Sequence, residues 1–347
     1  MDNNRFLIER ITRDITDGLM LVDLSGTIRY INPQGYVILN NPNIKENIKF
    51  VDLMKLDRNG QNDEFYQYLL DSVYDKQETH SGALIYRDPE GDIRYLLVKS
   101  SYAFSDDGKE KYGVILQFSD VTKAEKLRIK YNDAIKVLVA MVIVLSANNI
   151  IVKYWDFSGR PVDASYITLM IEIIGAIGTL LMLKFTSLTK HDLGLGKGTN
   201  LKETIIIDTL LTFVLFSAMV IVKLLVQRYR PDIIAPDDPL FYWDNWGPVS
   251  TFSPFTVFAQ ELMTRGAAQG CLKMVLPEKT PDWVPIVVSS LFFGALHIHK
   301  DLVFMIGAMI LLSIFGFIYN KQKTIWGLCI PHYILGLSIA ILWGFQA

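Results

Sequence analysis

The sequence predicts an α+β soluble domain followed by an all-α, polytopic bundle of membrane helices. The chain has 347 residues, half of them apolar, which is long enough for two domains. About 39 of its 70 charged residues fall within residues 1–130, the shorter part of the chain. Seven apolar runs long enough to cross or deeply enter a bilayer lie in the charge-poor remainder. The boundary between soluble and membrane parts is therefore expected near residue 130.

The composition excludes several classes of protein. A net charge of −2 argues against a nucleic-acid-binding surface, so no nucleic-acid partner is expected. The first residues, Met1 to Asp14, are polar and mixed in charge, so no signal peptide is recognised and the N-terminal domain is expected in the cytoplasm. Cys271 and Cys329 both lie in the apolar half and predict no disulfide framework.

The N-terminal elements follow the order two strands, helices, three strands. Gly18 to Asp23 has the pattern of a buried strand, Leu24 to Gly26 that of a turn, and residues 27–32 alternate as a partner strand. Pro33 then begins a short helix, and a helix over 63–76 has one apolar face, made by Phe65, Leu69, Leu70 and Val73. Further strands are expected at 82–87, 92–104 and 112–119, separated by glycine-containing turns at 88–92 and 106–109.

Three stretches in this order are typical of one family of sensor domains. Val22-Asp23, the stretch from Gly26 to Pro33, and the closing stretch from Phe118 to Thr122 resemble a PAS domain over about residues 8–126. The resemblance implies the fold and leaves the PAS ligand unknown, because PAS cavities hold different molecules or none. The domain has no cysteine for a flavin adduct, and His80 is expected in a solvated loop. PAS domains often pair, so a homodimer through this domain is one expectation.

A helix is expected to connect the two domains. Thr122-Lys-Ala-Glu125 fits a capping box, and the helix it would start continues into the apolar run that begins near Ile135. An inert tether and a signal-transmitting rod both fit this pattern. The predicted domains are a cytoplasmic sensor at 1–126, a connecting helix at 127–134 and a membrane domain at 135–347.

The membrane domain is expected to be multi-pass in the cell membrane, surrounded by lipid. Its apolar runs lie at about 133–152, 166–184, 204–225, 253–276, 284–298, 303–319 and 324–345, and the fifth is short. Because cytoplasmic loops are enriched in Lys and Arg, the lysine-bearing connections are expected inside: Lys184, Lys190, Lys197, Lys202, Lys279, Lys321 and Lys323. The acidic connection is expected outside: Asp232, Asp237, Asp238 and Asp244.

Ionisable residues inside these runs predict a polar site in the membrane. An acid, an arginine and two histidines cost several kcal/mol at the centre of a bilayer, which favours a functional role. Glu261 and Arg265 are four apart and would share a helical face, where they can pair. His297 and His332 lie on two further runs. An acid with two imidazoles can hold a catalytic metal such as zinc, or position a water for attack on a carbonyl.

Structural roles were open for several of these residues. An ion pair between Glu261 and Arg265 could only lock a helical bundle. Glu172 and Asp208 could line the same cavity, but hydrogen bonds between helices explain them equally well. His299 follows His297 by two residues and would point to nearly the opposite side of a helix.

The spacing of these polar residues resembles a known family. Gln260-Glu261-x-x-x-Arg265, Phe293-x-x-x-His297 and His332 resemble, in order and on separate helices, the motifs of the CAAX-protease and bacteriocin-processing (CPBP, or Abi) intramembrane proteases. The resemblance covers about residues 135–345. It implies an endopeptidase that cleaves membrane-associated peptides or proteins, such as prenylated CAAX proteins or bacteriocin precursors.

The resemblance also implies roles for the motif residues. The first acid position, here Gln260, would activate the water, and Arg265 would orient the acidic pair. His297 and His332 would bind water or a metal, for which Glu261, His297 and His332 are the expected ligands if a metal is used. A polar residue four after His332 would support the oxyanion; that position is Gly336.

Two residues differ from the family motifs at positions that take part in the reaction. Gln260 can hydrogen-bond a water but cannot accept its proton, and Gly336 offers no side-chain donor. We favour an active PAS-regulated peptidase in which Glu261 is the base. The alternative is a catalytically impaired relative that binds peptide or lipid-linked segments as a membrane sensor. A transporter or channel is less favoured, because no internal repeat or paired broken helices are present.

Overall fold

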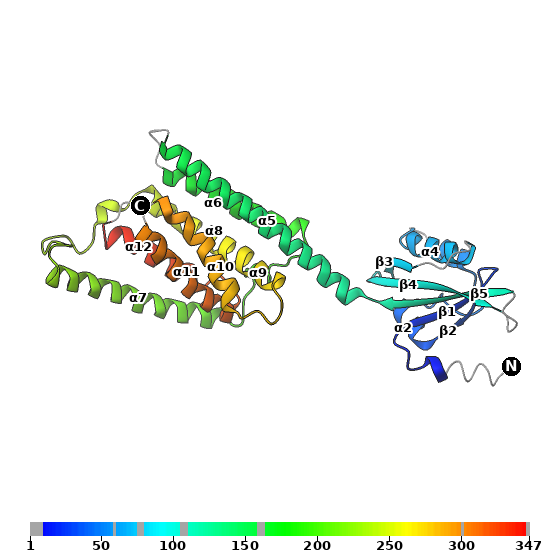
Figure 1. Cartoon of the computed structure of the whole chain (residues 1–347). Coiled ribbons are helices and arrows are strands. Elements are labelled where there is room, and N and C mark those ends of the chain that lie inside the picture. The colour runs from blue at the N-terminus through cyan, green and yellow to red at the C-terminus, as the bar shows by residue number, and fades with distance from the viewer. Residues whose placement is uncertain are drawn as a thin grey trace. The chain divides into compact units, whose positions relative to one another are not determined.

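The computed structural model describes residues 10–57, 60–74, 80–104, 110–157, 164–299 and 302–344. The chain divides into two compact units, and the division falls after Arg128 (Figure 1). The turn predicted at 106–109 lies outside the described residues.

The N-terminal unit contains a five-stranded antiparallel sheet. Its strands are β1 (Gly18–Asp23), β2 (Ile28–Ile31), β3 (His80–Arg87), β4 (Ile93–Phe104) and β5 (Lys111–Asp120), in the spatial order β2-β1-β5-β4-β3. The first two form the predicted hairpin, in which Met20 lies opposite Ile31. Gly26 takes a left-handed conformation in the turn, with φ of 77°. The loop position expected for His80 is wrong, because β3 begins at that residue.

Within the part of the unit that the structure describes, the helices with given bounds are α2 (Pro33–Leu39), α3 (Phe50–Leu56) and α4 (Asp63–Tyr74). The Asn32 side chain accepts a hydrogen bond from the backbone N–H of Gly35 at 2.8 Å, which caps α2. The predicted apolar face of α4 is buried at Phe65, Leu69 and Val73. Helices α2 and α4 contact the sheet, so the core forms between these layers (Figure 1).

A continuous helix, α5 (Thr122–Phe157), runs across the division between the units. It begins at the predicted residue, but the predicted capping box is wrong. The Thr122 hydroxyl accepts a hydrogen bond from the backbone N–H of Tyr95 on β4 at 2.9 Å, and Glu125 pairs with Arg128. The backbone N–H of Thr122 is satisfied by the Asp120 carboxylate, at 2.9 Å. The Thr122 side chain, which the sequence pattern assigns to the helix cap, is therefore bonded to β4 instead.

The second unit is helical within the described residues. After α5 its elements are α6 (Ala164–Phe185), α7 (Leu201–Tyr229), the 3₁₀ turn η1 (Trp243–Asn245), α8 (Pro248–Glu261), the π-helix η2 (Leu262–Gln269), α9 (Gly270–Val275), α10 (Trp283–Gly294), the 3₁₀ turn η3 (Ala295–His299), α11 (Leu302–Gln322) and α12 (Cys329–Ile341). Each of the seven predicted apolar runs contains a helix. Helix α6 packs on α8, α10 on α11, and α12 on both α7 and α8.

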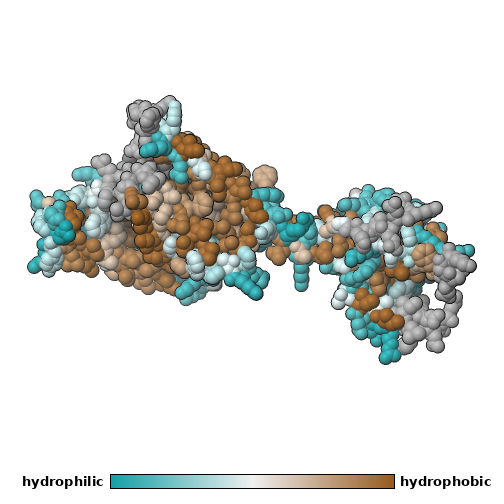
Figure 2. Space-filling model, viewed as in Figure 1, coloured by the Kyte–Doolittle hydropathy of each residue, from teal (hydrophilic) through white to brown (hydrophobic). Residues whose placement is uncertain are grey.

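Several helices have the length and surface of membrane-spanning segments. Among the described residues, 122–155, 201–229 and 304–322 are long and apolar enough to cross a bilayer, and 283–297 and 329–341 are shorter apolar helices. Only 11% of the most apolar window of α7 is buried, so its apolar side chains face outward. Figure 2 shows hydrophobic residues over much of the visible surface of this unit. These features and the N-terminal sheet confirm the predicted fold class.

The run predicted at 253–276 is divided into three consecutive segments. Pro254 lies inside α8. The π-helix η2 follows directly after Glu261 and is buried along its whole length. Short π-helical turns within α-helices often occur at functional sites. Here the π-helix carries Arg265 and begins immediately after the two motif residues of α8.

Candidate active site

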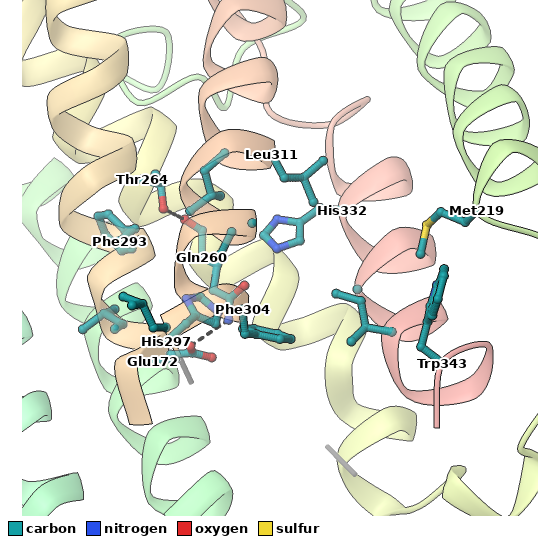
Figure 3. Close-up of a pocket in the computed structure, with 17 residues that line it drawn as sticks. Glu172, Met219, Gln260, Thr264, Phe293, His297, Phe304, Leu311, His332 and Trp343 are labelled. Carbon is teal, nitrogen blue, oxygen red and sulfur yellow. Dashed lines mark hydrogen bonds between the residues drawn. The ribbon is translucent and has the colours of Figure 1, made fainter. Parts of the chain in front are cut away.

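One cavity of about 900 Å³ lies within the helical unit (Figure 3). Its walls are mostly apolar and come from α6, α7, α8, η2, α10, η3, α11 and α12. Among the described residues, five polar side chains line it: Glu172, Gln260, Thr264, His297 and His332. An apolar cavity with a few convergent polar groups is the usual form of a ligand or substrate site.

Gln260 faces this cavity, and it is paired there with an acid. Its side-chain amide, through Nε2, donates to Oε1 of Glu172 at 2.7 Å (Figure 3). Glu172 lies on α6, which packs directly on α8, and its exposed fraction is 9%. Of the two explanations left open for Glu172, the structure therefore shows both: it lines the cavity and it hydrogen-bonds to another helix.

Glu261 does not line the cavity. Its carboxylate is fully buried, with Oε1 2.7 Å from Nδ1 of His332 and Oε2 3.4 Å from Nε of Arg265. An ionised carboxylate only accepts hydrogen bonds, so the Nδ1 of His332 donates and Nε2 is the ring nitrogen left for the cavity. The predicted pairing of Glu261 with Arg265 is present. The expectation that Glu261 would contact a cavity water is not met by this arrangement.

Arg265 is held in the interior by more than its acid partner. Its Nη2 donates to the backbone carbonyl of Leu312 on α11 at 2.6 Å, and the side chain has no exposed surface. The next residue, Gly266, lies against the backbone carbonyl of Leu193, where a Cβ atom would clash. A loop segment therefore approaches the π-helix closely at this glycine.

His297 lies in the 3₁₀ turn η3 at the end of α10. Its ring faces the cavity and lies 5.5 Å, between ring centroids, from that of Phe304 at the start of α11. The structure thus gathers His297, His332 and Gln260 around one cavity, with Glu261 and Arg265 behind His332. The side chain of His299 lies outside the described residues.

The position four after His332 opens onto empty space. Gly336 lines the cavity, and a Cβ atom built there would have no neighbour within 4 Å among the described atoms. A larger side chain at this position would therefore project into the cavity without a clash. Glycine at this motif position removes a hydrogen-bond donor, but the cavity has space for a side chain that would supply one.

The expected zinc ligands do not converge in this arrangement. Nitrogen and oxygen ligands lie about 2.0–2.2 Å from a zinc ion, so three of them must lie close together. Among the described acids, histidines and cysteines, the trio whose ligand atoms are all within 4.8 Å of one another is Asp88, Glu90 and Asp92, in the N-terminal unit. Glu261, His297 and His332 form no such trio, and Nδ1 of His332 is already bonded to Glu261. These three side chains do not fit one zinc ion.

Sequence reasoning placed Glu172 and Asp208 together as ambiguous acids, and the structure separates them. Asp208 on α7 accepts a hydrogen bond from Nε2 of Gln322 on α11 at 2.8 Å and does not line the cavity. Glu172 lines the cavity. The signal available in the sequence was an acid in an apolar run, and it is the same for both residues.

A family model matches part of the helical unit. Residues 242–337 match the family described as Type II CAAX prenyl endopeptidase Rce1-like. This stretch contains Gln260, Glu261, Arg265, His297 and His332, and also Gly336. Comparison with curated proteins finds no match for this chain.

The solved structures similar to this chain include several PAS domains. One is the PAS domain of a protein from Colwellia psychrerythraea, with 15% identity and a TM-score of 0.27, covering 34% of this chain and 98% of that one. The PAS domain from the fruit-fly ELK potassium channel is 14% identical with a TM-score of 0.28, covering 34% and 97%. The PAS domain from Bordetella pertussis BvgS is 14% identical with a TM-score of 0.29, covering 37% and 93%.

Proposed function

We propose that this chain, whose residues 242–337 match the Rce1-like CAAX protease family, is an intramembrane endopeptidase joined to a PAS-like sensor domain. The observation that carries the proposal is the cavity of about 900 Å³ into which a carboxylate and two imidazoles project from separate helices. Peptide hydrolysis needs a group that takes a proton from water and groups that polarise the carbonyl. Glu172, His297 and His332 are side chains able to fill these roles in this cavity.

Glu261 supports the reaction from behind His332. Its hydrogen bond to Nδ1 fixes the tautomer and orientation of the ring, as carboxylates do for histidines in many active sites. The Nε2 atom then faces a bound water or the substrate carbonyl. Arg265 holds the Glu261 carboxylate in place, which is the orienting role that the family resemblance implies.

The apolar walls of the cavity favour a substrate that is itself apolar beside the scissile bond. Met219, Phe293, Leu311 and Trp343 are among the side chains that line it. An isoprenoid chain or a membrane-embedded peptide segment would bury apolar surface there. A prenylated CAAX peptide is therefore the substrate class to test first.

A second candidate function is binding without efficient catalysis, as a membrane sensor. The observation that favours it is that both motif departures, Gln260 and Gly336, line the cavity. A relative of this kind would hold the same peptide or lipid-linked segment in the cavity and release it unchanged.

The proposed orientation places the PAS-like domain in the cytoplasm and the protein in the cell membrane as a multi-pass chain. The lysine-bearing connections, which follow the positive-inside rule, support this orientation. Labelling of single cysteines introduced at Lys190 and Asp237, using a membrane-impermeant reagent on intact cells, checks it. Labelling at residue 237 alone is the expected result.

The test of the function is cleavage by the purified full-length protein in liposomes. The probes are an internally quenched farnesylated peptide with a CAAX sequence and a quenched transmembrane peptide. Wild type is expected to cleave one of them, and His297→Ala and His332→Ala each to lower kcat/KM by about 100-fold or more. A wild type that binds a probe without cleaving it would favour the second function, and one that neither binds nor cleaves would contradict both.

A further inference from the structure

An acid on α6 lies beside the position where the motif acid is missing. Glu172 lies outside the stretch that matches the family, and none of the three motifs includes it. It is nine-tenths buried on an apolar helix, yet it lines the cavity that holds His297 and His332. Burying a carboxylate without a cationic partner is unfavourable, so its retention here calls for an explanation.

We propose that Glu172 is the general base of this site and that Gln260 is the residue that holds it in position. The proposal rests on the proposed peptidase function. In this arrangement the carboxylate has moved from the first motif position on α8 to the facing helix, α6. Gln260 then holds the carboxylate in position, and its presence in the motif does not mean that activity has been lost.

The hydrogen bond between the two side chains supports this exchange. Gln260 Nε2 donates to Oε1 of Glu172 at 2.7 Å, so the carboxylate lies one hydrogen bond from the side chain that would carry the motif acid. Within the described part of the chain the Glu172 carboxylate accepts this hydrogen bond through Oε1, and Oε2 is left for a water in the cavity. The glutamine amide supplies neutral N–H donors, which an ionised carboxylate can accept.

Asp208 and Gln322 show what a purely structural pair looks like in this protein. They also join two helices through an acid and a glutamine, with 2.8 Å between Oδ1 and Nε2. Neither side chain lines the cavity. The pair of Glu172 and Gln260 has the same chemistry but both members face the cavity, which is the difference that points to a role in the reaction.

The reaction uses water as its only co-reactant. The Glu172 carboxylate takes a proton from a water, and the resulting hydroxide oxygen bonds to the carbonyl carbon of the scissile peptide. The oxyanion that forms accepts a hydrogen bond from a ring N–H of His297. The carbonyl then re-forms as the C–N bond breaks, and the proton held by Glu172 passes to the leaving nitrogen. The products are a carboxylic acid and an amine, and Glu172 is again ionised.

The decisive experiment moves the carboxylate between the two positions. Glu172→Gln keeps the size of the side chain and an amide hydrogen bond to Gln260, so a structural role predicts little change. A role as base predicts a fall in kcat of about 100-fold to 10,000-fold. The double variant Glu172→Gln with Gln260→Glu restores the acid and the pair with the helices exchanged, and is expected to recover activity to within about tenfold of wild type.

Asp208→Asn is the matched control, because it removes a buried acid that pairs with a glutamine outside the cavity. It is expected to cleave the probe that wild type cleaves at a rate within about threefold of the wild-type rate. Thermal unfolding in the same detergent verifies that wild type and all four variants are folded.

The possible failures are distinguishable. Cleavage by Glu172→Gln at the wild-type rate overturns the role of Glu172 and leaves the peptidase function standing. A wild type that is inactive while Gln260→Glu alone cleaves also overturns it, because the carboxylate at position 172 would then not supply the base. If neither wild type nor Gln260→Glu cleaves any probe, the peptidase function itself fails and this proposal fails with it.

Discussion

Neighbouring residues of one motif do different work in this site. Gln260 faces the cavity, while Glu261 turns to the interior and meets Arg265 and His332. The contact of Glu261 with Arg265 could be predicted, because residues four apart share a helical face. The family resemblance placed Glu261 and His332 in one site, but their direct hydrogen bond could not be predicted, because it joins positions 71 residues apart and depends on how α12 packs on α8. The hydrogen bond between Glu172 and Gln260 could not be predicted either, because these residues lie 88 positions apart.

Removing Arg265 is expected to destabilise the protein. Arg265→Leu leaves the Glu261 carboxylate buried without its cation, and breaking a buried pair from one side costs about 3–5 kcal/mol. The double variant Arg265→Leu with Glu261→Leu removes both charges and is expected to recover part of the loss. Unfolding of both variants and wild type in detergent measures the difference. A double variant less stable than Arg265→Leu would contradict this account.

Restoring a donor at position 336 is expected to speed cleavage. The Asn side chain of Gly336→Asn would project into open space in the cavity, four residues after His332. Losing one oxyanion donor costs about 100-fold to 1,000-fold in rate, so a gain of at least about tenfold in kcat is expected. Gly336→Ala is the control, since it adds a Cβ atom without a donor. Equal rates for the two variants would show that the donor has no effect.

At the scale of elements, the loop between α6 and α7 contacts several parts of the site scaffold. Lys130 on α5 pairs with Asp192 at 2.7 Å, and the backbone N–H of Ile325 donates to the carbonyl of Gly194 at 3.0 Å. The carbonyl of Leu193 lies against Gly266 on the π-helix. The apolar run at 253–276 predicted helices in this region. It could not predict η2, because the i→i+5 hydrogen bonds of a π-helix depend on tertiary contacts such as the one at Gly266. This loop therefore contacts α5, the π-helix η2 and the segment before α12.

The ion pair of Lys130 and Asp192 in this loop makes a pH-dependent contribution to the stability of the protein. Burial alone would raise the pKa of Asp192, but hydrogen bonds from Lys130 and Thr189 lower it below the ordinary value of 3.8. A lowered folded-state pKa stabilises the protein above the unfolded value, and the stabilisation is lost as pH falls through the folded value. Asp192→Asn is expected to cost about 1 kcal/mol near pH 7. The difference from wild type should shrink below pH 3.8 in unfolding measurements, and a difference that is unchanged there would contradict the assignment.

At the scale of the whole molecule, the sequence predicted both units and their order. The concentration of charge before residue 130 and the apolar runs after it were sufficient, because a bilayer excludes charges from the segments that cross it. The structure adds that α5 is one unbroken helix from Thr122 to Phe157. Whether this helix transmits a signal depends on energetic coupling, which neither composition nor helix length determines.

Interrupting α5 is expected to change the activity of the membrane unit if the helix transmits the state of the sensor. A four-residue Gly/Ser insertion after Lys126 breaks the helix, whereas a seven-residue Ala/Glu/Lys insertion keeps it helical and close to its original phase. Couplings between sites are typically 1–3 kcal/mol, so a change in kcat/KM of at least about fivefold is expected for the flexible insertion. The helical insertion should stay closer to wild type. Equal rates for all three proteins would identify α5 as an inert tether.

The position of Glu172 on α6 predicts how residues 172 and 260 covary among related genes. The matched stretch, residues 242–337, begins well after this helix, so a gene fragment that carried that stretch alone would lack the carboxylate that faces the cavity. Positions 172 and 260 should therefore vary together among related genes. Where the motif on α8 begins with glutamine, we expect an acid on α6, and where it begins with glutamate, selection for that acid is removed.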